Sequence, residues 1–577
     1  MYTPISAATK ADSQSTVELA PFYYLDNFRA LLDAVVAQYA DLLRPEELGF
    51  ATGFAALQPR EQALMVRIYS RQGPLLRSDR LVYAELPDLP DLLESLAAKG
   101  WLLRNPATTR EVLLSCLTRA ELTAWCGAGT VGRRADRLAS AQGETQDILA
   151  RVPFVFIEPC HRPILRTFMD LFFGNRHQDL STFVVSQLGH VRYPRYALDS
   201  HSRFFRDRAA LEHFGVLAAL REQVREIEEA RFGNPGSSRQ PPHGGQPRSE
   251  TRDSTGAALL AIAHAIPDLP ADDPLRPRAD RLRNRIARQL ERLDETSGAL
   301  EVYAGSLGPP ARERRARILF KRGDPSGCES LCQAMSEAPL DYSEEHFARH
   351  FLPRCQKKRG IKVTPPPVLS VPIRHLTLPG RPVEGLENGV ARHLSGAGSD
   401  AFHLENWLFN ALFGLLFWDC LYQPVRGAFM HPFQTRPADL FEAGFAARRR
   451  AAIEQVFHDL ETEPHRLAAQ VQETWQRCVG YANPFVGWLP EGDRLLQRAL
   501  AHLPASHLSK VFRHLLGDLR NHASGFPDLL VLHGDGGYEL IEIKGPGDQV
   551  RPNQAQWLDF FAREGIPAAL LRVDWPP

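Results

Sequence analysis

The sequence predicts a multidomain protein with mainly α-helical N-terminal and middle regions and a C-terminal α/β domain. Its 577 residues are enough for three or four domains of ordinary size. Apolar residues recur at helical spacing through most of the chain before about residue 351. A segment poor in apolar residues, 233–256, divides this helical part in two. From about residue 376, short apolar runs of strand length occur among helical patterns, which indicates an α/β domain.

The composition is that of an ordinary globular protein, with 44% hydrophobic and 24% charged residues. The formal net charge of zero does not exclude nucleic acid, because only local basic patches need to face phosphates. The N-terminus lacks an apolar signal core, and the longest apolar run, Trp407–Tyr422, is too short to span a bilayer. The eight cysteines are scattered, and the one close pair, Cys328 and Cys332, lacks a second ligand pair for zinc. We therefore expect a cytoplasmic protein with no membrane partner.

The N-terminal part begins with polar residues, 1–16, which we expect to be loose. Residues 17–232 then form a first helical region. Within it, the segment Leu92–Leu103 is a helical pattern followed by Gly100 and a short apolar run. Helix, turn and strand in this order are typical of a winged-helix-like module.

A second module is predicted near residues 115–140. Thr118 and Glu121 form a capping signal, and two short helical patterns flank a glycine-rich turn that contains Arg133 and Arg134. This arrangement is typical of a SAP-like module, which places a helix N-terminus and basic residues against DNA phosphates. An ordinary helical hairpin with a solvated charged face fits the same pattern equally well.

The middle of the chain begins with the segment 233–256, whose Gly, Pro, Ser, Gln and Arg content predicts a flexible linker. Residues 257–375 follow as a helical array whose helix-pair spacing resembles tetratricopeptide-like (TPR-like) repeats. Basic residues crowd one stretch of this array, and they form either a solvated helix surface or a phosphate-binding pocket. These residues are Arg312, Arg314, Arg315, Arg317 and Lys321.

The C-terminal domain, residues 376–577, contains the most informative pattern. Asp528 opens an apolar run, a Gly-Asp-Gly turn follows, and a second run carries Glu542 and Lys544, which predicts a β-hairpin. Side chains alternate along a strand, so Glu542 and Lys544 point to one side while Ile543 points into the core. A three-residue loop at 534–536 places Asp528 directly opposite Glu542.

Two carboxylates and one ammonium group on a single patch have a chemical use. Mg²⁺ and Mn²⁺ prefer carboxylate oxygens, and a bound cation lowers the pKa of the water that attacks a phosphodiester. A neighbouring lysine orients that water or stabilises the developing negative charge. Asp528, Glu542 and Lys544 therefore fit the PD-(D/E)-x-K nuclease pattern. The alternative for Glu542 and Lys544 alone is a structural ion pair on one face of a strand.

Two further residues are less clear from their positions. Glu405 lies near the start of an apolar helix that we expect to run from Phe402 to about Tyr422, so it is either a first-turn acid or a further metal ligand. Gln554 lies near the start of the helix expected over residues 552–564.

Three motifs of this domain resemble those of the VRR-NUC nucleases. They are Gly525-Phe526-Pro527-Asp528, Ile541 to Asp548, and Asn553-Gln554 followed by Trp557-Leu558. With Glu405, Phe413 to Asp419 and Leu180 to Gly189 upstream, most of the chain from about residue 60 is similar to the bacterial form of the Fanconi-associated nuclease family. The resemblance implies a restriction-endonuclease-like VRR-NUC fold for residues 376–577.

The same resemblance implies a structure-specific, metal-dependent DNA nuclease with 5′-flap endonuclease and 5′–3′ exonuclease (phosphodiesterase I) activity. It implies repair of interstrand crosslinks, branched or flapped double-stranded DNA as the substrate, and a bacterial cytoplasm with nucleoid association during repair.

Carried over by motif, the resemblance implies that Glu405, Asp528, Glu542 and the Ile543 carbonyl hold Mg²⁺ or Mn²⁺ and that Lys544 is the catalytic lysine. It further implies that Arg520 and Gln554 lie at the DNA and that the family has a 5′-phosphate pocket, for which Arg312 to Lys321 is the candidate.

The chain also departs from the family pattern. The ubiquitin-binding zinc finger of eukaryotic members has no counterpart among its Cys and His residues, and the Val-Arg-Arg motif reads Val550-Arg551-Pro552. Two other functions remain open at this point: a branched-DNA-binding repair scaffold with an inactive nuclease remnant, and a nuclease that resolves four-way (Holliday) junctions.

Overall fold

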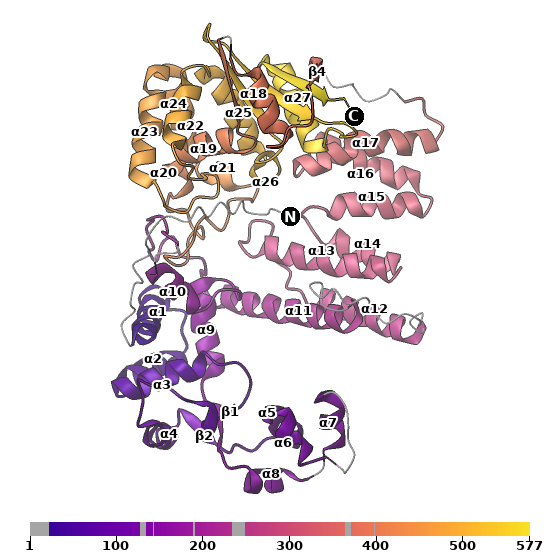
Figure 1. Ribbon diagram of the computed structural model, residues 1–577. Coiled ribbons are helices and arrows are strands. Elements are labelled where there is room, and N and C mark those ends of the chain that lie inside the picture. Colours follow the sequence, from indigo (N-terminus) through magenta and orange to yellow (C-terminus); the bar gives the residue numbers. More distant parts are fainter. Residues whose placement is uncertain are drawn as a thin grey trace. The chain divides into compact units, whose positions relative to one another are not determined.

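The structure is a computed structural model that describes residues 22–126, 134–141, 143–188, 191–232, 249–363, 371–396 and 398–576. It comprises two compact units that divide between Val191 and Arg192 (Figure 1). We call them the first and the second unit. In the described part of the chain, no helix combines the length and the apolar character needed to cross a membrane.

The first unit is a helical domain with a small antiparallel sheet. In chain order, its first helices and strands are α1 (Tyr23–Tyr39), α2 (Pro45–Ala56), α3 (Pro59–Tyr69), β1 (Leu76–Arg77), the 3₁₀-helix η1 (Ser78–Arg80), α4 (Leu89–Ala98) and β2 (Leu102–Arg104). The helix, turn and strand predicted for residues 92–103 are thus confirmed as α4 and β2. The central strand of the sheet, β3 (Phe156–Pro159), comes from later in the chain and pairs with both others.

Between β2 and β3, the described residues form four short helices: α5 (Arg110–Cys116), α6 (Arg119–Thr123), α7 (Arg134–Ser140) and α8 (Thr145–Arg151). Thr118 and Glu121 form the predicted capping box at the start of α6. Leu113, Leu122 and Ile148 build a separate small core for this insertion. The turn with Arg133 lies outside the described residues. The unit closes with α9 (Arg162–Phe173) and α10 (Ser181–Gln187).

The second unit begins with an array of helices. They are α11 (Arg208–Phe232), α12 (Ser249–His264), α13 (Arg276–Arg292), α14 (Thr296–Ala304), α15 (Ala311–Lys321), α16 (Pro325–Glu337) and α17 (Tyr342–Lys358). Successive helices pack against each other, as expected for a TPR-like array (Figure 1).

Two expectations for this region need correction. Residues 249–256 of the predicted linker are helical, because the stretch after Pro247 contains no Gly or Pro before Gly256 and continues as α12. The helix α11 packs on α12 and α13 and belongs to the second unit, whereas the predicted first helical region extended to residue 232. The remaining domain boundaries stay predictions.

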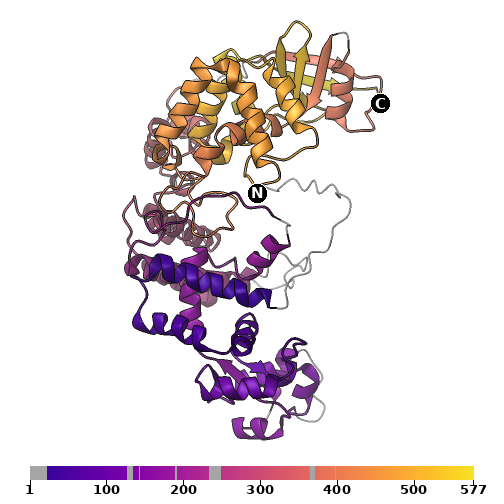
Figure 2. The same cartoon turned by 90° about the vertical axis from the view of Figure 1, so that its left-hand side faces the viewer.

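A five-stranded mixed sheet forms the C-terminal part, in the order β4-β8-β7-β6-β5. The strands are β4 (Ile373–Thr377), β5 (Ser399–His403), β6 (Leu529–His533), β7 (Tyr538–Lys544) and β8 (Ala568–Asp574). Figure 2 shows the sheet beside the C-terminus, next to the helices of residues 407–517. Strand β7 is flanked by antiparallel β6 and parallel β8, so the strand that carries the predicted site is central.

Helices cover both faces of the sheet. Leu530, Leu532 and Leu540 pack into the large helical core, whereas Ile541 and Ile543 pack into a second core with α18 (Leu386–Leu394). The helices of the large core include α19 (Trp407–Leu416), α20 (Trp418–Leu421), α21 (Phe445–Arg448), α22 (Arg450–Thr462), α23 (Leu467–Cys478), α24 (Gly492–Leu500), α25 (Ala505–Gly517), α26 (Leu519–His522) and α27 (Pro552–Glu564).

The predicted start of the apolar helix at Phe402 is wrong. Phe402 pairs with Leu530 as part of strand β5, and α19 begins only at Trp407. Glu405 has a positive φ of 38°, in the left-handed region, and this turn separates the strand from the helix.

Candidate metal centre

The predicted β-hairpin has the predicted register. Leu529 pairs with Ile541, which places Asp528 opposite Glu542 one step further along the ladder. The His533 amide donates to the Gly537 carbonyl at 2.9 Å, so the loop consists of residues 534–536. The period of two along each strand and the Gly-Asp-Gly turn together fix this alignment.

The side chains of Glu542 and Lys544 meet on one face of β7. The Lys544 Nζ donates to Glu542 Oε1 at 2.5 Å, and the Lys544 residue is only 8% exposed. Glu542 is fully buried, and its second oxygen, Oε2, has no hydrogen-bond partner among the described residues. A buried carboxylate oxygen without a partner is costly, and a cation would satisfy it.

Hydrogen bonds of the backbone hold Asp528 and Glu405 close to each other and to β7. The amide of Glu405 donates to the Asp528 carbonyl at 3.0 Å, while Asp528 Oδ2 accepts the amide of Ile543 at 2.8 Å. Asn406 fixes this arrangement, because its amide nitrogen donates to Glu405 Oε1 at 3.1 Å and its Oδ1 accepts the Gly525 amide at 2.8 Å. Glu405 is therefore at the site, before the helix, and is not a first-turn residue of α19.

The electrostatics of the cluster also suit a cation. Burial, followed by the neighbouring Asp528, raises the pKa of Glu542 to about 7 against the opposing effect of Lys544. Burial also raises the pKa of Asp528, against the lowering effects of the Ile543 amide and Lys544. Both carboxyl groups would return to their ionised forms beside a hard divalent ion, for which oxygen ligands are appropriate. The residues present therefore fit Mg²⁺ or Mn²⁺.

The three carboxylates are spaced more widely than the ligands of one ion. Among the described residues, the one group of three candidate ligand atoms within 4.8 Å of each other is a cysteine triad in the helical array. Glu405 is exposed, and its carboxylate is directed to Asn406. A single ion therefore reaches all three acids only after a side-chain rotation.

Arg520 and Gln554 occupy ordinary structural positions near this centre. Gln554 Oε1 accepts the Arg551 amide at 3.0 Å and so caps α27. The Arg520 guanidinium lies 4.9 Å from the centre of the Phe441 ring. Their contacts with DNA, and the Ile543 carbonyl as a ligand, stay predictions.

The basic stretch of α15 is largely occupied by internal ion pairs. Arg312 pairs with the buried Glu344, and Arg314 pairs with Glu291. The other pairs are Arg317 with Glu313 at 2.9 Å and Lys321 with Asp294 at 3.7 Å. Of the five, Arg315 alone has no partner among the described residues. The structure therefore does not gather these residues into an open phosphate pocket, and that role stays a prediction.

The structure adds residues that the sequence did not indicate. Glu387, on the first turn of α18, contributes negative potential at Asp528. Arg281 of α13 lies near Arg221 and Arg520; desolvation lowers its pKa, and these two cations lower it further. The many arginines of α13 were a sequence signal that could have indicated Arg281. Nothing in the spacing of the sequence distinguished Glu387.

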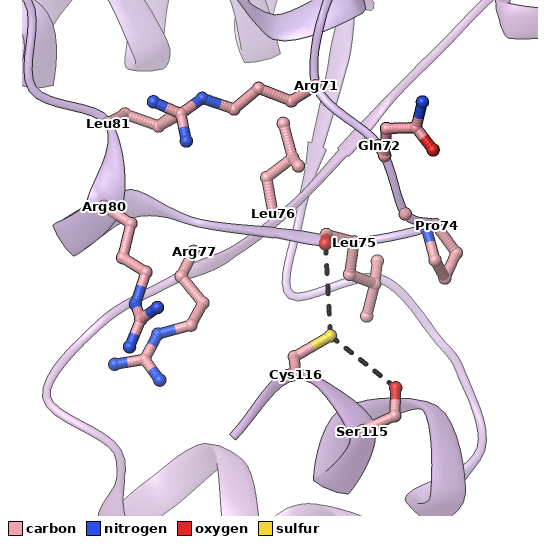
Figure 3. A pocket seen from close by; sticks show the side chains of 11 residues that line it. Arg71, Gln72, Pro74, Leu75, Leu76, Arg77, Arg80, Leu81, Ser115 and Cys116 are labelled. Carbon is pink, nitrogen blue, oxygen red and sulfur yellow. Dashed lines mark hydrogen bonds between the residues drawn. The ribbon is translucent and has the colours of Figure 1, made fainter. Parts of the chain in front are cut away.

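A pocket of about 430 Å³ lies in the first unit, between the β1–η1 segment and α5. Figure 3 shows Arg77 and Arg80 side by side at its edge, with Cys116 below Leu75. Arg77 is paired with Asp79 and Glu121, whereas Arg80 is exposed and has no partner among the described residues. Arg134 of the inserted module is also exposed, and its guanidinium donates to the Ser115 carbonyl at 2.5 Å.

Comparisons with known proteins find matches in both units of the chain. The family model described as "VRR-NUC domain" matches residues 462–575, and that described as "FAN1, HTH domain" matches residues 22–103. The Fanconi-associated nuclease 1 homolog of Pseudomonas aeruginosa is 33% identical over 571 residues, which cover 96% of either chain. Human Fanconi-associated nuclease 1 is 26% identical over 96% of this chain and 62% of its own length.

Two solved structures extend the similarity to three dimensions. A crystal structure of paFAN1 bound to gapped DNA with a 2-nucleotide 5′ flap has a TM-score of 0.81 and 30% identity, and covers 97% of this chain and 99% of that one. A second, with a 1-nucleotide flap, has a TM-score of 0.79 and 31% identity over 97% and 100%. Because the Pseudomonas aeruginosa relative is 33% identical and the match covers 96% of either chain, the chain belongs to the Fanconi-associated nuclease family.

Proposed function

We propose that this DNA repair nuclease is a metal-dependent 5′-flap endonuclease and 5′–3′ exonuclease that uses Mg²⁺ or Mn²⁺. The observation that carries the proposal is the buried, unpartnered Oε2 of Glu542 beside Asp528 and Lys544. When bound there, a divalent cation polarises the scissile phosphate and lowers the pKa of the attacking water.

The residues around that cation have different roles. Asp528, Glu542 and Glu405 provide oxygen ligands, with the Ile543 carbonyl as a further one. Lys544 lies in hydrogen-bond contact with Glu542, at 2.5 Å, and so stays at the site as a positive charge. From this position its ammonium group orients the water or stabilises the charge that develops on the phosphate.

The substrate follows from the relatives and from the charges. Both solved paFAN1 structures contain 5′-flap DNA, and this chain is similar to them over 97% of its length. With zero formal net charge, the grip on DNA must come from local cations such as Arg80, Arg134, Arg315 and Arg520. We infer a role in interstrand crosslink repair, in the cytoplasm and at the nucleoid, with no membrane partner.

The experiment that tests this function is cleavage of a labelled 5′-flap duplex with and without metal. The wild type should cut only with Mg²⁺ or Mn²⁺, while Asp528→Asn and Lys544→Ala should lose at least about 10²-fold in rate, since each removes a group that stabilises the transition state. Duplex binding in chelator should persist. Asp535→Asn, in the exposed hairpin loop, is the matched control and should cut normally.

Substrate comparison separates the alternatives. A four-way junction cut faster than flap, nicked and gapped duplexes would favour the resolvase. A wild type that binds flaps yet cuts nothing with either metal would favour the scaffold. Full cleavage by Asp528→Asn would reject the proposed site altogether.

A further inference from the structure

Three cysteines of the second unit meet in the core of the helical array. Cys328 and Cys332 lie one turn apart on α16, and Cys355 lies on α17, which packs directly against α16 (Figure 1). Their three sulfurs lie within 4.8 Å of one another, and all three residues are fully buried. We call this cluster the cysteine triad. In the sequence, only the Cys328–Cys332 pair was apparent.

The surroundings of the triad are apolar and include one more soft ligand. Its neighbours are Ala316, Met335, Phe347, Ala348 and Phe351. Cys328, Cys332 and Met335 follow one another at helical spacings of four and three, so they share one face of α16. The thioether of Met335 therefore belongs to the same buried cluster.

The charges around the cysteine triad restrict the class of ion that it can bind. Burial, followed by the neighbouring Cys355, raises the pKa of Cys332 to about 12, and burial also raises the pKa of Cys328. The nearest charged side chain on α16, Glu329, is negative and is paired with Arg359. Arg317 and Arg354 lie over the Phe347 and Phe351 rings, but no cation is among the main influences on the pKa of Cys328 and Cys332. An ion that requires few thiolates is therefore favoured.

We propose that the cysteine triad is a binding site for a soft monovalent cation of the Cu⁺ class. Thiolate and thioether sulfur select such ions over hard ones. Structural Zn²⁺ takes four ligands, and no fourth Cys, His, Asp or Glu joins the triad among the described residues. Binding needs one proton to leave, RSH + Cu⁺ → RS–Cu + H⁺, and the thioether of Met335 supplies a second sulfur ligand that is neutral. The other two thiols stay protonated and surround the ion. The occupied cysteine triad is then electrically neutral, which its apolar surroundings favour.

The site would join the last two helices of the array. Helix α17 also contacts the nuclease part, where the Tyr342 amide donates to Asp518 Oδ2 at 2.9 Å. An ion that binds only the folded state stabilises it by mass action. Occupancy should therefore raise the thermal stability of the full chain without taking part in DNA cleavage.

The test is Cu⁺ titration of the reduced full-length protein under anaerobic conditions, against a Cu⁺ chelator. The wild type should bind one Cu⁺ per chain, with sulfur-only coordination in X-ray absorption. Cys332→Ala and Cys355→Ala should each lower the affinity more than about 100-fold, since even the outer partners of metal ligands contribute 10–100-fold. Cys478→Ala, which removes a buried thiol outside the triad, is the matched control and should bind as the wild type does.

Two further measurements keep the result interpretable if a core variant is destabilised. Circular dichroism of the metal-free variants reports whether they are folded, and the melting temperature of the wild type should rise on addition of Cu⁺. Uptake by the wild type that does not exceed that of Cys332→Ala would overturn the proposal. So would preferential binding of one equivalent of Zn²⁺, or a wild-type melting temperature that Cu⁺ leaves unchanged. None of these readouts depends on nuclease activity.

Discussion

At the scale of single residues, the pairing of charges decides which basic groups are available to DNA. Arg312 and Arg315 lie on the same helix, three positions apart, and nothing in their sequence positions distinguishes them. In the structure, Arg312 neutralises Glu344, which is only 1% exposed, whereas Arg315 has no partner among the described residues. The first therefore serves the fold, and the second remains a candidate for phosphate contact.

This difference predicts opposite effects of two alanine substitutions. Arg312→Ala leaves a buried carboxylate unpaired and should cost about 2–4 kcal/mol of unfolding free energy, somewhat below the range for fully buried pairs. Arg315→Ala should stay within about 0.5 kcal/mol, as for most surface substitutions. Urea denaturation of both variants measures this. An Arg312→Ala midpoint equal to that of the wild type would contradict the structural role.

At the scale of elements, the site depends on how the chain enters β6. Gly525 has φ of +92°, and a Cβ there would lie 2.8 Å from the backbone of Asn553 at the start of α27. Its amide also donates to Asn406, the residue that holds Glu405. The turn at Gly525 thus couples α27, Asn406 and Asp528.

Gly525→Ala should therefore destabilise the fold by about 2–4 kcal/mol, combining left-handed backbone strain with a backbone clash. Gly547→Ala is the matched control, since φ there is +82° but nothing lies within 4 Å of the added Cβ. It should cost only about 1 kcal/mol, from the backbone alone. The two losses are compared by thermal or urea unfolding; equal losses would show that the close approach at Asn553 has no role.

A second element-scale feature is a layer of histidines between α25, α26 and α27. The rings of His514 and His522 stack at 4.2 Å, and the His522 Nδ1 donates to the His514 carbonyl at 2.6 Å. His522 Nε2 then accepts from Gln556 at 2.6 Å, which requires a neutral ring. Burial, followed by His522 and Arg563, lowers the pKa of His514 to about 3 against the opposing effect of Asp518.

The free energy of unfolding should therefore decrease as the pH falls from about 6.5 towards 3. His514 binds its proton in the unfolded chain near pH 6.5 and in the folded chain only near pH 3, so the stabilisation is complete above pH 6.5 and is lost as pH falls towards 3. At pH 5 the loss is on the order of 1–2 kcal/mol. His514→Phe keeps a ring against Phe560 and should flatten the pH dependence. The free energy of unfolding at pH 8, where His514 is neutral in both states, measures the effect of the substitution on packing alone. If the free energy of unfolding of His514→Phe changed between pH 7 and 5 as much as that of the wild type, the role assigned to His514 would be contradicted.

At the scale of the whole molecule, the sequence predicted local arrangements well and distant ones poorly. The hairpin register followed from alternation and turn chemistry, so Asp528, Glu542 and Lys544 could be placed together in advance. The place of Glu405 at the site could not be derived from spacing, because it depends on a left-handed turn and on a hydrogen bond to Asp528, over a hundred residues away. Only the family resemblance brought it in.

The same limit applies to the helical regions. The sequence showed α4 and β2 but not that the central strand of their sheet, β3, returns after a four-helix insertion. The partners of Arg312 and of the Cys328–Cys332 pair, Glu344 and Cys355, both lie on α17, and the sequence did not reveal either pairing. Periodicity indicates which element a residue belongs to, whereas its partners depend on how elements pack.

The balance of charge over the molecule leads to a last prediction. Basic and acidic residues are equal in number, 68 each, so the net field gives DNA no general attraction. Affinity must come from local cations without internal partners. Among the described residues Arg80 is one such cation, exposed beside the pocket of the first unit. Arg225 of α11 is a suitable contrast, since it is exposed but paired with Glu222 and Glu229.

Arg80→Ala should weaken flap binding and reduce the slope of log K against log salt by about 0.9, the value for one lost phosphate contact. Arg225→Ala changes the net charge equally and should leave that slope unchanged, because its charge is already neutralised within the helix. Cleavage at saturating DNA should be the same in both variants, since neither residue lies in the metal centre. Equal slopes for the two variants would mean that overall charge governs binding, and the local cations would lose their assigned role.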